Sequence, residues 1–237
     1  MQTRTWNSLA ELDPLWTVLT LPEKRFGRWN QEEFFATGEA EIAKAFEICA
    51  MLGQPKERKV AVDFGCAVGR LSRALARRFE RVIGIDVSKS MISLGRELNR
   101  EISNLEFIVN ETHALPIPDS TVDFVYSSIV LQHLESDERI LAWISEFMRV
   151  LRPGGLLAFQ LPDRLPLRHR LQGRRRVFAA LSAFGFSPAT LLKMGLAPIA
   201  MRGLSPRTVL QHLAPTPALL LQNWNWEKDF IYFVAKR

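Results

Sequence analysis

The sequence predicts an α/β domain in which a mostly parallel sheet is wrapped by helices on both faces. Three observations predict this class. The 237 residues suit one domain of generous size. Apolar residues make up 47% of the chain and charged residues 24%, which excludes disordered, collagen-like and coiled-coil proteins. Short β-rich runs alternate with amphipathic helical runs through the middle of the chain, as in βαβ units.

Residues 1–55 are predicted to form a helical cap on the N-terminal side of this core. Within them, residues 39–52 place Ile42 and Phe46 on one face at helical spacing. Gly53 and Pro55 then end the helix.

The predicted core spans residues 56–162. Pro153 and the two glycines after it are expected to end one helix and start the next strand, and Ser88 is a candidate helix N-cap. We expect strands at residues 59–64, 81–86, 105–109, 122–127 and 155–161, and helices at residues 70–78, 90–101 and 136–151.

Residues 204–237 form the predicted C-terminal part of the core. Two β-rich runs, residues 218–223 and 229–235, flank a short NWNWEK connection. They are typical of a terminal hairpin that adds antiparallel pairing to the sheet.

The two cysteines and the first twenty residues are typical of a protein inside the cell. Cys49 and Cys66 do not form a CxxC pair, so neither a disulfide framework nor a thiolate metal site is indicated. The first twenty residues lack a basic segment followed by an apolar run, so no secretory leader is predicted. We therefore expect a cytoplasmic protein, with peripheral membrane contact as an alternative discussed below.

The run KVAVDFGCAVGRL, residues 59–71, carries the strongest chemical signal. A buried strand reaches Asp63, a loop of small residues follows, and a helix begins. A ligand there would lie at the carboxyl edge of a parallel sheet, beside the free amides of a helix N-terminus. The dinucleotide pattern GxGxxG fails, because Ala67 and Arg70 occupy its second and third glycine positions. An NAD site is therefore disfavoured.

This segment resembles motif I of the class I S-adenosylmethionine-dependent methyltransferases, D/E-x-G-x-G-x-G. Asp63, Gly65 and Gly69 match it, and Ala67 replaces the middle glycine. Further matches follow in the family's order: Asp86 in VIGIDVS, residues 110–112 after the third strand, residues 123–134 around the fourth, and residues 149–160 through the fifth. The resemblance covers residues 59–161.

The resemblance implies a Rossmann-like sheet of seven strands in the order 3-2-1-4-5-7-6, with the last strand antiparallel. It also implies S-adenosylmethionine as cofactor and S-adenosylhomocysteine as product. Asp86 would accept hydrogen bonds from the ribose hydroxyls, and the segment 34–38 (FFATG) would fold over the amino-acid end of the cofactor. The expected cofactor-binding residues are Asp63, Gly65, Cys66, Ala67, Gly69, Asp86, Val87, Met91, Asn110, Glu111, Thr112 and Ser127.

Each of these residues also has a structural interpretation. The glycines could form a plain tight turn, Asp86 could cap the next helix, and Asp63 could organise the loop without touching ligand. Glu111 could be a solvated acid in a turn.

Methyl transfer needs alignment of the acceptor with the sulfonium, and a hydroxyl or amine acceptor must also lose a proton. His133, after the fourth strand, is the candidate catalytic base, although it could equally be bonded to a backbone carbonyl. Some quinone-biosynthesis relatives carry metal-binding acids at this point. Ile129 and Gln132 stand there instead, so no metal is expected.

Residues 163–203 form a predicted helical insertion of unusual charge. Between residues 164 and 226 the chain has nine of its 31 Lys and Arg residues and no Asp or Glu. A basic tract at residues 168–176 precedes residues 177–201, whose only charge is Lys193, and internal Pro and Gly residues argue against a membrane span. We expect a lid over the active site. The alternative is membrane-surface contact through residues 168–202, and nucleic acid is disfavoured because no binding motif accompanies the arginines.

The sequence therefore predicts methyl transfer from S-adenosylmethionine to a small or lipid-linked acceptor, at oxygen. Two alternatives stay open. One is a nucleic-acid or protein methyltransferase that uses the basic insertion, which predicts binding that weakens steeply with salt. The other is a non-catalytic protein that binds S-adenosylmethionine, in which Ala67 marks decay of the site.

Overall fold

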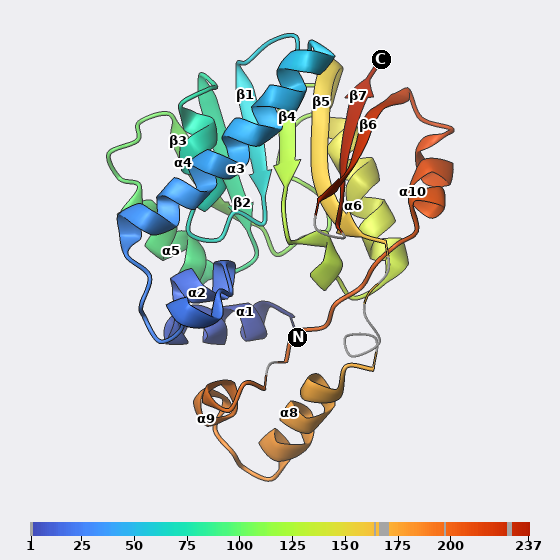
Figure 1. The fold of residues 1–237 in the computed structure, drawn as a ribbon. Helices are drawn as coiled ribbons and strands as arrows, with labels where there is room; N and C mark the ends of the chain where they lie inside the picture. The colour runs from blue at the N-terminus through green and yellow to red at the C-terminus, as the bar shows by residue number, and fades with distance from the viewer. Residues whose placement is uncertain (1, 164, 166–170, 197, 227–228) are drawn as a thin grey trace.

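A seven-stranded sheet forms the middle layer of the molecule (Figure 1). The structure is a computed structural model, and it describes residues 2–163, 165, 171–196, 198–226 and 229–237. The strands are β1 (Val60–Phe64), β2 (Arg81–Asp86), β3 (Leu105–Val109), β4 (Val122–Ser127), β5 (Leu151–Pro162), β6 (Ala218–Trp226) and β7 (Asp229–Lys236). Their order is β3-β2-β1-β4-β5-β7-β6, which confirms the order that the family resemblance implied.

The pairing directions also match the prediction. β1 pairs parallel with both β2 and β4, and β3 and β5 extend the parallel part on either side. β7 pairs antiparallel with β5 and with β6. The carboxyl ends of β1, β2, β3 and β4 therefore meet along one edge of the sheet. The turn residues Glu227 and Lys228 of the predicted terminal hairpin lie outside the described residues.

The start of β5 differs from the prediction. The strand begins at Leu151, and Pro153 lies within it instead of in a turn before it. The pairing with β4 shifts register between Val122 and Phe124, so the chain accommodates the extra residues as an irregularity in the strand. Gly154 has φ of 79°, and a Cβ on Gly155 would lie 2.9 Å from the Arg152 carbonyl oxygen. Glycines at both positions allow this close backbone approach.

Helices cover both faces of the sheet. α3 (Gln31–Leu52) and α4 (Arg70–Ala76) pack on one face, where Phe46, Leu75 and Phe124 share a buried cluster. α6 (Asp137–Val150) and α10 (Pro206–Leu213) pack on the other, around Phe147 and Val209. α5 (Lys89–Leu98) contacts β2 and β3. α3 starts earlier than expected, because the Asn30 side chain caps the backbone amides of Glu32 and Glu33.

The predicted cap, residues 1–55, is divided in the structure: α3 packs on a face of the sheet, whereas the preceding elements lie at its carboxyl edge. These elements are α1 (Gln2–Leu12), α2 (Pro14–Val18) and a short 3-10 turn, η1 (Pro22–Lys24). α1 contacts α5, and the Ser88 hydroxyl donates to Asn7 Oδ1 over 2.7 Å. In Figure 1, α1 and α2 lie below the strand ends. This part of the chain is thus placed to cover a ligand bound there.

The insertion forms two helices, α8 (Gly173–Ala183) and α9 (Pro188–Lys193), which project beyond the same edge (Figure 1). We call residues 171–196 the insertion hairpin. Arg25 donates a hydrogen bond to the carbonyl of Leu192 and so ties the hairpin to the N-terminal region. Residues 164 and 166–170, part of the predicted basic tract, lie outside the described residues. No described helix is long and apolar enough to cross a membrane.

Candidate active site

A cavity of about 500 Å³ opens at the carboxyl edge of the sheet. Its walls come from the loop between β1 and α4, the end of β2, the loop after β3, and the loop between β4 and α6. Trp6 of α1 and Thr17 and Val18 of α2 also line the cavity. The cavity thus lies where the topology of a parallel sheet favours ligand binding.

The β1–α4 loop forms the cavity floor with Gly65, Cys66 and Ala67, and it contains three residues with a left-handed backbone. Gly65, Ala67 and Gly69 have φ of 74°, 48° and 86°. A Cβ on Gly65 would lie 2.3 Å from Val130 Cγ2, and one on Gly69 would lie 2.6 Å from Phe107 Cζ. Ala67 adopts a left-handed conformation that glycine favours, and its methyl group opposes that conformation. The substitution therefore leaves a strained residue in this loop.

Asp86, at the end of β2, binds this loop directly. Its Oδ2 accepts the Ala67 N–H over 2.9 Å, and its Oδ1 accepts the Ser88 N–H over 2.8 Å. Burial raises the pKa of the Asp86 carboxyl, and the backbone N–H bonds oppose that rise. Each oxygen keeps a lone pair for a further donor. Asp86 therefore organises the loop and still presents an acceptor to the cavity.

Asp63 is buried beneath the same loop. The Ser72 hydroxyl donates to its Oδ2 over 2.5 Å. Burial raises the pKa of the Asp63 carboxyl to about 7, and the Ser72 bond and the nearby Arg70 charge limit the rise. With 1% of its surface exposed, Asp63 acts mainly as an internal organiser of the loop.

The segment 34–38 reaches the cavity only through Arg70. It is helical, lies within α3, and crosses α4 so closely that a Cβ on Gly38 would be 2.2 Å from the Arg70 carbonyl oxygen. The Arg70 guanidinium bonds Thr37 Oγ1 over 3.4 Å and Glu41 Oε2 over 2.7 Å. Its Nε is buried and has no hydrogen-bond partner in the described part of the chain. Arg70 lines the cavity, whereas residues 34–38 do not.

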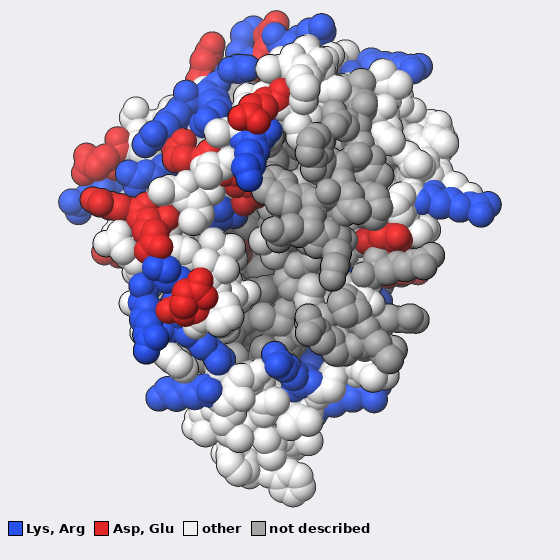
Figure 2. Space-filling model, in the orientation of Figure 1, with Lys and Arg blue, Asp and Glu red and all other residues white. Residues whose placement is uncertain are grey.

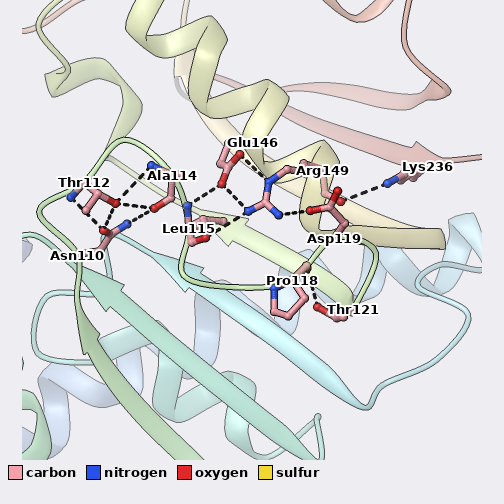
Figure 3. A network of polar contacts seen from close by, with 10 residues as sticks. All are labelled: Asn110, Thr112, Ala114, Leu115, Pro118, Asp119, Thr121, Glu146, Arg149 and Lys236. Atoms are coloured by element: carbon pink, nitrogen blue, oxygen red, sulfur yellow. Dashed lines mark hydrogen bonds and ion pairs between the residues drawn. The ribbon is translucent and has the colours of Figure 1, made fainter.

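Asn110 organises the loop that follows β3 (Figure 3). Its Oδ1 accepts the backbone N–H and the hydroxyl of Thr112, over 3.0 and 2.7 Å, and its amide donates to the Ala114 carbonyl over 2.9 Å. Glu111, half-exposed, pairs with Lys89 over 3.2 Å. The side chains of Asn110 and Thr112 are thus engaged in shaping the turn.

Two residues of α6 hold the far end of this loop (Figure 3). Glu146 accepts the Leu115 N–H over 2.6 Å, and Arg149 pairs with Glu146 over 2.6 Å and with Asp119. The Arg149 guanidinium lowers the pKa of Glu146. Lys236, near the end of β7, donates to the Arg149 carbonyl over 3.4 Å. The loop is therefore clamped to the body of the fold at both ends.

His133 lies in the cavity wall with both ring nitrogens engaged. Its Nδ1 donates to the Ala200 carbonyl over 2.9 Å, because a carbonyl can only accept. Its Nε2 then accepts from the Gln132 amide, 3.2 Å away. Burial lowers the pKa of His133, and the Trp6 ring lies edge-on at 5.5 Å. Burial therefore favours the neutral form of the imidazole.

Most of the predicted cofactor residues come together around the cavity. Gly69 and Ser127 do not line it: Gly69 is the N-cap of α4, and the Ser127 hydroxyl bonds the Phe64 carbonyl over 3.3 Å inside the sheet. The predicted residues that line the cavity are Asp63, Gly65, Cys66, Ala67, Asp86, Val87, Met91, Asn110, Glu111, Thr112 and His133.

Sequence reasoning missed several wall residues. Arg70 follows motif I directly, so a search for charges beside the loop could have found it. Arg139 and Trp143 are on α6, and helical periodicity alone does not show that they reach the cavity. The insertion was expected to form the lid, but the described residues of the insertion hairpin do not line the cavity, and α1 and α2 do.

The chain is similar in sequence and fold to known methyltransferases. A family model described as "Methyltransferase domain" matches residues 62–159. The trans-aconitate 2-methyltransferase of Deinococcus radiodurans is 33% identical over 136 residues, which are 56% of this chain and 49% of that protein. The comparisons support membership of the class I S-adenosylmethionine-dependent methyltransferase superfamily for the matched core, residues 62–159. Asp63 and Asp86 both lie within these matched residues.

Two further comparisons extend the relationship. The malonyl-[acyl-carrier protein] O-methyltransferase of Methylococcus capsulatus is 34% identical over 46% of this chain and 38% of that protein. The chain thus spans half or less of the length of these two curated relatives. The magnesium protoporphyrin IX methyltransferase of Synechocystis PCC 6803, solved with bound SAH, covers 100% of this chain and 98% of its own, with a TM-score of 0.64 at 15% identity. That likeness shows the methyltransferase fold.

Proposed function

We propose that this chain transfers a methyl group from S-adenosylmethionine to a carboxylate oxygen of an acceptor molecule. The observation that carries the proposal is the cavity itself. Its lining includes the Asp86 carboxylate at the sheet edge, which we assign to the cofactor, and Trp6, Trp143 and the cation Arg139, which we assign to the acceptor. One cavity can thus hold the two reactants side by side.

The cofactor end suits S-adenosylmethionine in its donor set. A ribose diol needs an acceptor, and Asp86 retains lone pairs toward the cavity. The amino-acid end carries a carboxylate, and Arg70, which also pairs with Glu41, is a cation in the cavity lining. Asn110 and Thr112 shape the loop beside the expected adenine position. When bound there, the cofactor supplies an electrophilic methyl group.

The acceptor end is apolar apart from a few groups. Leu134, Ile129 and Val130 line it together with the two tryptophans, and Glu135 and Arg139 form an ion pair of 3.0 Å. Glu135 is 51% exposed, so water stabilises it when Arg139 turns to another carboxylate. Arginine binds carboxylates in a bidentate geometry that fixes their orientation.

The state of His133 favours a carboxylate over a hydroxyl acceptor. A hydroxyl acceptor must lose its proton during methyl transfer. His133 Nε2 could take that proton only after breaking its hydrogen bond with the Gln132 amide. A carboxylate is already ionised at neutral pH and needs no base. We therefore assign His133 to the cavity wall, where Ala200 and Gln132 hold it. Trans-aconitate and malonyl groups, in the names of two relatives, also carry carboxylates.

The test is transfer of labelled methyl from S-adenosylmethionine to trans-aconitate and to a malonyl thioester. A methyl ester releases its label as volatile methanol in alkali, whereas ethers and N-methyl groups do not. We expect alkali-labile product, and we expect Arg139→Gln to raise the KM for the acceptor by about tenfold or more, the loss of one charged hydrogen-bond pair. The matched control is Arg100→Gln, because Arg100 is exposed and pairs with its equally exposed neighbour Glu101.

Other outcomes separate the alternatives. Alkali-stable product would contradict the carboxylate assignment and return His133 to the role of base. Tight binding of S-adenosylhomocysteine without transfer to these acids or to a fractionated lysate would support the non-catalytic alternative.

A further inference from the structure

The insertion hairpin exposes large apolar side chains that the rest of the molecule does not cover. Phe184 is 83% exposed and Met194 62%, and Phe186 and Val177 are also exposed. None of the residues of α8 is buried. Exposed apolar side chains scattered singly are ordinary, but this set is gathered in one projecting element. The hairpin therefore has a surface whose composition the fold itself does not explain.

The charges of the hairpin are all of one sign. Arg174, Arg175 and Arg176 occupy the first turn of α8, and Lys193 ends α9. Cations at a helix N-terminus oppose the helix dipole, so these arginines do not stabilise α8. No Asp or Glu occurs anywhere between residues 164 and 226. The surface thus suits an anionic partner.

The arginines and the two phenylalanines lie at opposite ends of α8, because Arg174, Arg175 and Arg176 occupy its first turn and Phe184 and Phe186 follow its last residue. Figure 2 shows a tip without charged side chains at the lower end of the molecule, with Lys and Arg above it in this view. Figure 1 places α8 and α9 at this end, away from the sheet. Phe184 and Phe186 flank the turn after α8, where Gly185 has φ of 89°. An apolar tip below a cationic rim matches the two layers of an anionic lipid surface, acyl chains beneath phosphates.

We propose that the insertion hairpin docks on anionic lipid, with Phe184 and Phe186 entering the acyl boundary and the arginines of residues 174–176 contacting headgroup phosphates. A second copy of this chain fits less well, because a two-fold contact through the tip would bring two arginine clusters together. A nucleic acid would use the arginines but would leave the phenylalanines in water. Lipid is the occupant that uses both zones.

The docking surface is joined to the cavity wall. The segment that follows α9 makes two hydrogen bonds with residues beside the cavity. His133 donates to the Ala200 carbonyl, and the Arg202 N–H donates to the Gln132 carbonyl over 2.7 Å. A docked hairpin would therefore hold this edge of the cavity close to the lipid. Lipid binding by the hairpin does not depend on the identity of the methyl acceptor. Either proposal can fail while the other holds.

Vesicle co-sedimentation of the full chain tests it. The vesicles are pure phosphatidylcholine or phosphatidylcholine with about 30% phosphatidylglycerol, at low and high salt. We expect binding to the anionic vesicles at least about tenfold above binding to the neutral ones, and a decrease with salt. Phe184→Ser with Phe186→Ser, and Arg174→Gln with Arg175→Gln and Arg176→Gln, should each lose about tenfold.

The control is Met51→Ser. Met51 is 70% exposed at the end of α3, on another part of the molecule, and the variant should bind like the wild type. Equal unfolding midpoints would show that all variants fold. Absence of binding to anionic vesicles, or equal binding by the phenylalanine variant, would overturn the proposal. So would a dimer in sedimentation velocity that the phenylalanine variant loses, or salt-sensitive binding of single-stranded RNA that only the arginine variant loses.

Discussion

The cofactor loop, residues 63–70, and the insertion hairpin, residues 171–196, lie at the same edge of the sheet but are held there differently. In the loop, backbone and side chains are fixed from several sides: Asp86 binds Ala67, Ser72 binds Asp63, and Glu41 holds Arg70. In the hairpin, most side chains face solvent. The conformation of the loop is thus explained by contacts within the protein. The exposed surface of the hairpin is explained only by a binding partner.

The glycines of the two regions show the same contrast. Gly65 and Gly69 combine a left-handed backbone with neighbours that leave no room for a Cβ. Gly185 and Gly195 are also left-handed, with φ of 89° and 81°, but a Cβ at either would meet nothing within 4 Å. The first pair serves packing as well as conformation, and the second pair serves conformation alone.

The largest expected effect comes from adding a methyl group to the loop. Gly65→Ala places its Cβ against Val130 in addition to straining the backbone, so we expect a loss of about 2 to 4 kcal/mol in the free energy of unfolding. Urea denaturation measures it. Gly195→Ala is the control and should lose about 1 kcal/mol, the conformational cost alone. Equal losses in the two variants would remove the distinction between the regions.

A second effect depends on pH. Because burial raises the pKa of Asp63 to about 7, its contribution to stability is complete below its unfolded pKa, near 4, and is lost as the pH rises through 7. Asp63→Asn cannot ionise, so the variant does not lose this stability as the pH rises. We expect the stability of the variant relative to wild type to increase by about 1 to 2 kcal/mol between pH 5 and pH 8, in urea denaturation at each pH. A difference that does not change with pH would mean that Asp63 is ionised in the fold.

Ala67→Gly should stabilise the loop slightly. The substitution relieves the left-handed strain at φ of 48°, offset by the greater freedom of glycine in the unfolded chain, so we expect a gain of up to about 1 kcal/mol. Ala142→Gly, on the exposed side of α6, is the control of opposite sign and should lose about 1 kcal/mol. Destabilisation at Ala67 would show that its methyl group packs usefully in the cavity floor.

The smallest effect is expected in the hairpin. Phe184→Ser should change the free energy of unfolding by no more than about 0.5 kcal/mol, because the ring is 83% exposed. Phe124→Ala, a fully buried ring in the sheet, should lose about 3 to 5 kcal/mol in the same assay. A large loss at Phe184 would show that the hairpin contributes to the stability of the fold.

The same contrast explains what could be predicted from the sequence. β2, β3 and β4 begin and end at the predicted residues, because short β-rich runs bounded by turn and polar residues indicate strands. The start of β5 was missed, because Pro153 indicates a turn and only the pairing with β4 shows an irregular strand. That Trp6 walls the cavity depends on where α1 lies in space, which no local pattern records.

The edge of the sheet around Asp86 is the expected cofactor site. Calorimetric titration with S-adenosylhomocysteine tests this without knowledge of the acceptor. We expect a Kd of about 1 μM, a loss of about 1 to 3 kcal/mol in binding free energy in Asp86→Ala, the cost of unmade hydrogen bonds to a carboxylate, and no change in the exposed control Glu101→Ala. Absence of binding to the folded wild type, or equal affinity of Asp86→Ala, would contradict it.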